Sequence, residues 1–135
     1  MRRFSIVLLL AVMVTGVTFS QDSKPPLDYS VYDTWNSLSA YKMTNDGKWL
    51  TYEINPSVGD GELFVRSLVT NREVAFQRGD AAVFSPNSDF LAFKIKVYAD
   101  TVRQNKIDKV KKDKQPQDSL VLYYPETNET QKWAN

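Results

Sequence analysis

The segment FSPNSDFLAF, residues 84–93, closely repeats the segment MTNDGKWLTY, residues 43–52. In both segments, a polar turn precedes a run that contains aromatic and aliphatic residues. Asp46-Gly47 and Asn87-Ser88 are residue types that hydrogen-bond to their own backbone and tolerate the left-handed conformation. The chain is therefore predicted to reverse at both places and then to enter a strand.

The two segments belong to a longer internal repeat. They align with a constant offset of 41 residues, which pairs Thr44 with Ser85, Trp49 with Phe90 and Tyr52 with Phe93. A second set of matches has an offset of 57 residues: 62–65 with 119–122, and 71–76 with 128–133. The difference between the offsets gives the second copy 16 additional residues between its middle strands.

Short alternating stretches bounded by Asn, Asp, Gly and Pro predict a mostly β protein, and aromatic residues make up 13% of the chain. The clearest predicted strands are Lys48–Ile54, Glu62–Leu68, Phe90–Val97 and Ser119–Tyr124. A helix is favoured only around Asp33–Leu38, where Asp33 is placed to cap a short turn.

A repeat of about 40 residues with four short strands is the size of one blade of a β-propeller. The expected fold is all-β: two four-stranded blades of an incomplete β-propeller after a signal peptide. The rings of Trp49 and Tyr52, and of Phe90 and Phe93, cannot all face one side of a regular strand, so some must pack between blades and others at an edge. The alternative is two unrelated hairpins with similar turns, but two matches in the same order favour the repeat.

The first 20 residues have the pattern of a secretory signal peptide. Arg2 and Arg3 precede the apolar run Ile6–Val14, and the small residues Thr18 and Ser20 suit cleavage before Gln21. We expect an exported protein, periplasmic or extracellular, without membrane attachment after cleavage. An uncleaved anchor or a buried helix is the alternative, although the run is shorter than the ~20 residues that span a bilayer.

Charge and cysteine content limit the class of protein. Two of the 17 basic residues and none of the 16 acidic residues lie in the leader, so the mature chain has a net charge of −1. This balance argues against nucleic acid as a partner. The chain has no cysteine, so its stability must come from a core, and about 115 mature residues suffice for one modest domain.

Three segments carry a resemblance to a known family: VYDTWNSLSAYKMTNDGKWLTYEINPSVGDGELFVRSL, FSPNSDFLAFKIK, and the Lys-rich run leading to QPQDSLVLYYPETNE. Together they resemble the start of exported bacterial peptidases of the prolyl oligopeptidase family, in the dipeptidyl aminopeptidase branch. The Tyr32-Asp33-x-Trp35 lead-in and the basic insertion before Asp118 are its most discriminating features. The resemblance implies a propeller that caps an α/β-hydrolase domain and filters peptide substrates.

The catalytic motif of that family has no counterpart in these residues. A serine peptidase triad needs histidine as general base, and the chain has no histidine and no Gly-x-Ser-x-Gly elbow. The resemblance therefore implies that the triad lies in a C-terminal domain beyond residue 135. No catalytic, cofactor-binding or metal-binding residue is assigned, no cofactor is expected, and the Glu-based amino-terminus clamp of dipeptidyl-releasing members has no counterpart.

Two other functions remain open at this stage. The first is a non-enzymatic periplasmic propeller, similar to Tol-type propellers, that binds protein partners through its loops. The second is a short product without a function. Two blades cannot close a ring of the usual four to eight, so we expect the remaining blades as partners and this chain as an N-terminal fragment.

Weaker candidate sites have simpler interpretations. Asp46, Asp60 and Glu62 could be imagined as a calcium or magnesium site, but VGDGEL lacks the ligand spacing of a calcium loop and predicts a turn between the second and third strands. Asn128-Glu129-Thr130 matches the N-glycosylation pattern, which usually has no meaning in a bacterial protein.

The predicted organisation is a lead-in at 21–40, one blade at 41–81, and a second blade at 82–135 with a basic insertion at 101–117. The insertion has six basic and two acidic residues, which gives +4. We interpret it as a solvated hairpin extension, with a short polar helix between Lys106 and Lys112 ended by Pro116. The alternative is attraction of an anionic surface or of peptide carboxylates. Nucleic-acid binding is disfavoured because the insertion has no aromatic residue for stacking.

Overall fold

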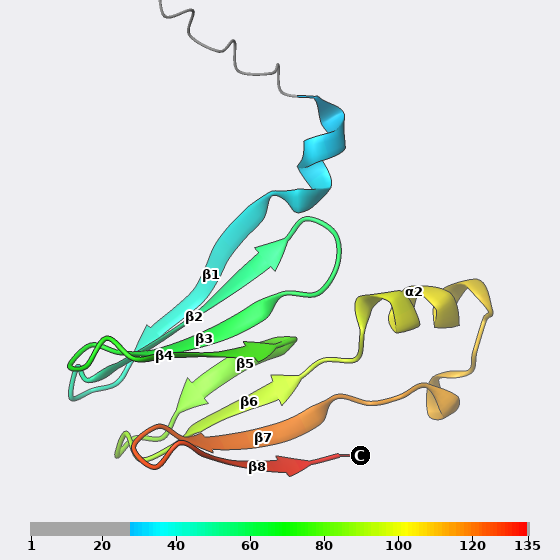
Figure 1. Cartoon of the computed structure of the whole chain (residues 1–135). Coiled ribbons are helices and arrows are strands. Elements are labelled where there is room, and N and C mark those ends of the chain that lie inside the picture. Colours follow the sequence, from blue (N-terminus) through cyan, green and yellow to red (C-terminus); the bar gives the residue numbers. More distant parts are fainter. Residues whose placement is uncertain (1–27, 135) are drawn as a thin grey trace, which may run out of the picture.

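Two antiparallel four-stranded sheets form the framework of the part of the protein that the structure describes (Figure 1). The computed structural model describes residues 28–134, so the predicted signal peptide and its cleavage site lie outside the described residues. Strands follow one another along the chain as neighbours in both sheets. The first sheet contains β1 (Asn36–Met43), β2 (Trp49–Pro56), β3 (Glu62–Ser67) and β4 (Glu73–Gln77); the second contains β5 (Gly79–Phe84), β6 (Leu91–Ile95), β7 (Ser119–Tyr124) and β8 (Glu129–Trp133). The predicted all-β fold is confirmed.

The turns that open the two quoted segments have the same hydrogen bonds. The Thr44 hydroxyl oxygen accepts the backbone N–H of Trp49 at 3.0 Å, and the Ser85 hydroxyl oxygen accepts that of Phe90 at 3.2 Å. Gly47 and Ser88, 41 residues apart, have φ of +70° and +65°. The predicted left-handed conformation is present in both turns, and the Asp46 side chain accepts the Lys48 N–H as expected, whereas in the second turn it is the Ser85 hydroxyl that accepts backbone N–H groups.

A β-bulge repeats with the same offset in the first strand of each sheet. The pairing of β1 with β2 shifts between Ser39 and Lys42, and that of β5 with β6 shifts between Asp80 and Val83. Within these bulges Ala40 has φ of +49° and Ala81 has φ of +55°. Because a bulge adds one residue and bends its strand, both first strands bend at equivalent places.

The core lies between the two sheets. Leu63 and Val65 of β3 are buried against a face of the second sheet that includes Phe93 and Tyr123. The Phe76 ring lies 4.8 Å from the Phe93 ring and 4.9 Å from the Tyr123 ring, between centroids. Burial of each large apolar side chain contributes roughly 1.5–3 kcal/mol, so this layer is the main stabilising contact between the sheets.

The two sheets pack front to back, which means that the face of the first sheet in the contact is not the repeat equivalent of the face that the second sheet presents. Trp49 lies in the core, whereas its repeat equivalent Phe90 packs beside Tyr124 on the far side of the second sheet. Conversely, Phe93 lies in the core, whereas its equivalent Tyr52 stacks on Phe64 away from the second sheet, with centroids 5.2 Å apart. The prediction that some rings pack between the sheets is confirmed, and the contact uses two different faces of the repeat.

Two local predictions near the amino-terminal end are wrong. A 3₁₀ helix, η1, spans Tyr29–Thr34, while Asn36–Leu38 already belong to β1. The residue at its N-cap is Asp28, without a side-chain cap, so Asp33 does not begin a helix. The sheets begin at Asn36 and Gly79, earlier than the blade starts expected at 41 and 82, because the bulged first strands extend upstream of the turns.

The basic insertion connects β6 to β7 and contains a helix at a different place from the predicted one. Helix α2 spans Ala99–Ile107, and η2 is a short 3₁₀ turn at Lys112–Lys114. The helix ends at Ile107 with Asp108 as its C-cap, and Lys109 then takes a φ of +52°, so Pro116 is not what ends it. None of the α2 residues is buried, and Figure 1 shows α2 standing beyond the ends of the strands.

Candidate functional site

Three polar side chains of the first sheet and its turns form hydrogen bonds to the backbone of the second repeat. Glu53 is only 5% exposed, and its carboxylate accepts the backbone N–H of Ala81, in the second bulge, at 3.0 Å. The Lys42 ammonium donates to the carbonyl of Ala82 at 2.8 Å, and the Asn45 amide donates to that of Pro86 at 3.3 Å. The Lys42 and Asn45 contacts span 40 and 41 residues, close to the repeat offset, whereas the Glu53 contact spans 28.

Each sheet leaves its other face uncovered by the described residues. On the first sheet, Leu38 and Met43 are 63% and 60% exposed beside Tyr52 and Phe64. On the second, Val83 and Leu120 are 54% and 49% exposed. We call these the first outer face and the second outer face. Exposed apolar clusters of this kind typically mark interaction surfaces.

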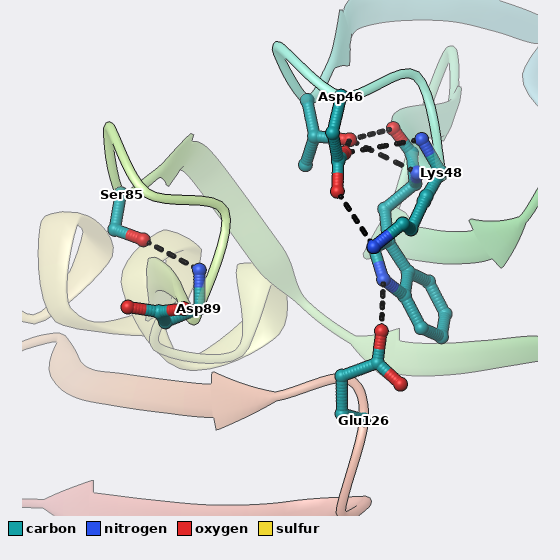
Figure 2. Close-up of polar contacts among 7 residues, drawn as sticks. Asp46, Lys48, Ser85, Asp89 and Glu126 are labelled. Carbon is teal, nitrogen blue, oxygen red and sulfur yellow. Dashed lines mark hydrogen bonds and ion pairs between the residues drawn. The ribbon is translucent and has the colours of Figure 1, made fainter.

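A cavity of about 570 Å³ lies between the sheets beside Trp49, at the end that carries the turns from β1 to β2, from β3 to β4 and from β7 to β8. Its charged residues are Lys48, Arg72 and Glu126. The Trp49 ring N–H donates to the Glu126 carboxylate at 3.4 Å (Figure 2), and the Arg72 guanidinium donates to the carbonyl of Pro125. Arg72 also lies 5.8 Å from the centre of the Trp49 ring. These contacts join the two sheets.

The turn that carries Asp46 stabilises its carboxylate. Asp46 accepts the Thr44 hydroxyl at 2.6 Å and the Lys48 N–H at 3.2 Å, and the Lys48 ammonium lies 3.3 Å away (Figure 2). These hydrogen bonds, led by that of Thr44 and aided by the Lys48 charge, lower the pKa of Asp46 below its ordinary value. The group is structural: it closes the turn before β2.

The carboxylates considered for a metal site do not come together. Asp46 precedes β2, whereas Asp60 follows it and Glu62 begins β3, at the opposite end of the strand. The prediction of a turn at VGDGEL, between the second and third strands, is confirmed. Within residues 28–134, no group of three or more His, Cys, Asp or Glu side chains is placed to hold a metal ion. In the sequon, the Asn128 side chain accepts the Tyr123 hydroxyl at 3.0 Å.

A second cavity, of about 340 Å³, lies at the opposite end, where α2 approaches both sheets. We call it the insertion cavity. Its wall comes from the β2–β3 loop, the single residue Arg78 that links β4 to β5, the end of β6, and α2. Asp60 fixes the helix by accepting the Ala99 N–H at 2.9 Å. The basic insertion is visible in the sequence, whereas Arg78 and Lys96 lie outside it and line the cavity without any local signal.

Comparisons of the chain with protein-family models, with known proteins and with solved structures find no match. The resemblance to prolyl oligopeptidases therefore rests on the sequence segments alone. Within residues 28–134, no helix has the length and apolar character needed to cross a membrane.

Proposed function

We propose that the two sheets are consecutive blades of a β-propeller that serves as the substrate-filtering lid of an exported serine peptidase related to prolyl oligopeptidase. The observation that carries the propeller is the front-to-back packing. A contact between two different faces of the same repeat can be made again on both sides, and such contacts produce a closed ring when the rotation allows it. If two equivalent faces met instead, both would be used up in one contact, and no third sheet could add in the same way.

The outer faces support the same proposal. The first outer face is the repeat equivalent of the surface that the second sheet buries, and it presents Leu50, Tyr52 and Ile54 where the second sheet presents Leu91, Phe93 and Ile95. The edge strands also pair on one side only. Further sheets of the same repeat would cover both faces, as neighbouring blades do in a propeller.

The peptidase part of the proposal depends on the sequence resemblance. The chain itself contributes no histidine, so hydrolysis would require a triad outside these residues. In this function the described residues do no chemistry. They form part of a rigid wall that restricts which peptides reach the catalytic domain, and the insertion cavity would lie on one end of that wall.

The test uses the product that cells make from this gene. An antibody against residues 28–134 would recover it, and a fluorophosphonate probe, which labels active serine hydrolases, would then be added with and without prior phenylmethylsulfonyl fluoride. We expect a labelled product larger than the 135-residue chain, with labelling blocked by the inhibitor. A larger product that stays unlabelled would overturn the peptidase proposal and favour a propeller that binds protein partners. A stable product of 135 residues or fewer would overturn both.

A further inference from the structure

The insertion cavity has a strongly unequal charge. Four cationic side chains line it, from Arg78, Lys96, Arg103 and Lys106, and the carboxylate of Asp60 is the one acidic group in its lining. Asp60 is already engaged by the Ala99 N–H, and Lys96 lies 3.6 Å from Asp80. The other three cations have no acidic partner at ion-pair distance within residues 28–134. A concave surface of one sign attracts ligands of the opposite charge.

Arg78 is the most constrained of these cations. Its backbone has φ of +60°, its N–H donates to Gly61 at 2.8 Å, and its carbonyl accepts the Lys96 N–H at 2.9 Å. Its guanidinium lies 3.6 Å from the centre of the Tyr98 ring, and Nη1 donates to the carbonyl of Lys96 at 2.9 Å. The charged group is therefore held in place before any ligand arrives.

One donor of this guanidinium is unused. The Nε atom of Arg78 is buried and has no hydrogen-bond partner. A buried donor without an acceptor is energetically unfavourable, and more so when it carries charge. The buried Nε is out of reach of a ligand, whereas Nη2 is not among the buried unpartnered atoms and can donate a charge-assisted hydrogen bond to a carboxylate oxygen. Arg103 and Lys106, both exposed on α2, lie at the same cavity and can add charge attraction.

We propose that the insertion cavity binds the free carboxylate of a peptide, with Arg78 as the anchor and with Arg103 and Lys106 as attracting charges at the rim. The cavity volume of about 340 Å³ falls at the lower end of the ~300–1,000 Å³ of ligand sites, which suits a chain terminus rather than a large cofactor. The site uses residues of both sheets and of the insertion, so it depends on their joint packing. It does not depend on the proposed peptidase function.

The first experiment titrates the full 135-residue chain with acetyl-Ala-Ala-Ala bearing a free carboxylate, and with the same peptide as its amide. The readout is the NMR resonance of the Arg78 Nε–H, with calorimetry for affinity. We expect saturable binding of the acid, a shift of that resonance as the guanidinium is engaged, and at least about tenfold weaker binding of the amide, because it lacks the charge-assisted hydrogen bond. Equal affinity for acid and amide would overturn the proposal, as would tighter binding of inorganic phosphate than of the acid.

Variants assign the effect to the cavity. Arg78→Gln is expected to weaken binding of the acid about tenfold or more by removing the anchor. Because Arg78 also joins the sheets, the double change Arg103→Gln with Lys106→Gln provides a test on exposed residues that leaves the fold intact. Its control is Lys111→Gln, which removes charge from the same insertion outside the cavity lining. We expect the double variant to bind severalfold more weakly and the control to bind as the parent does. Equal weakening by all variants would show general charge attraction and refute a built site.

Discussion

Replacement of Ala81 by Gly is predicted to stabilise the protein, although the same change in an ordinary strand destabilises it. Ala81 is exposed and has φ of +55° in the bulge of β5. A left-handed conformation costs a residue with a Cβ roughly 1–2 kcal/mol, which Gly avoids. Gly adds an entropic cost of roughly 0.5–1 kcal/mol relative to Ala. The difference leaves a net stabilisation of about 0.5–1 kcal/mol.

The repeat supplies a second site and a matched control. Ala40, 41 residues upstream, has φ of +49° and is also exposed, so Ala40→Gly should stabilise by a similar amount. Ala75 of β4 is exposed too, but it is not among the residues with positive φ. Ala75→Gly should therefore cost about 0.5–1 kcal/mol.

Urea unfolding of the full chain, followed by circular dichroism and by tryptophan fluorescence, measures these changes. With a slope of about 1–3 kcal/mol per molar urea, we expect midpoints about 0.5 M higher for the two bulge variants and about 0.5 M lower for Ala75→Gly. If all three variants lose stability equally, the left-handed bulges are absent in solution and the equivalence of the two first strands fails. If only one bulge variant gains stability, the bulge does not repeat.

Three further predictions concern packing and pH. Gly79→Ala should cost roughly 1–3 kcal/mol in urea unfolding, because a Cβ there would lie 2.5 Å from that of Leu63, and overpacking of a core is destabilising. The Asp46 carboxylate has a lowered pKa, so its contribution to stability is present above pH 3.8 and is lost as the pH falls further. In a pH series of thermal unfolding, Asp46→Asn should therefore remove that part of the acid dependence. Burial, and then the hydrogen bond to Glu73, raise the pKa of Tyr52 above 10, so the contribution of Tyr52 to stability is present below pH 10 and is lost at higher pH. If Tyr52→Phe loses stability as steeply as the parent in an alkaline series of unfolding measurements, this assignment is contradicted.

The second and third strands of both sheets could be predicted from the sequence because they are short runs rich in aliphatic and aromatic residues bounded by turn residues. Ser119–Tyr124 was predicted with its observed bounds. The first strands, β1 and β5, were expected in a four-stranded repeat but could not be given bounds, and both contain a bulge at the repeated Ala. An extra residue in the bulge shifts the side-chain alternation from one face to the other within the strand, so a search for period two finds only two short fragments.

The packing of the sheets and the insertion cavity depend on contacts between distant residues. Both faces of β2 and of β6 contain large side chains, so no local pattern indicates which face meets the other sheet. The cavity brings Arg78 and Lys96 to a helix that follows them in the chain, and its depth depends on where α2 is anchored by Asp60. The +4 charge of the insertion was visible in the sequence, but the burial of the Arg78 Nε was not.

The contact made by Glu53 also indicates what kind of neighbour the outer faces would accept. Glu53 meets the bulge at Ala81, and the repeat places Lys94 on the second outer face at the position equivalent to Glu53. If a second copy of this chain stacked in the same way, its Ala40 bulge would meet the Lys94 ammonium. An ammonium has no acceptor for the N–H that the Glu53 carboxylate accepts between the present sheets. The second outer face therefore fits a sheet with a different residue pattern better than a copy of the first, and this mismatch disfavours open-ended stacking of identical chains.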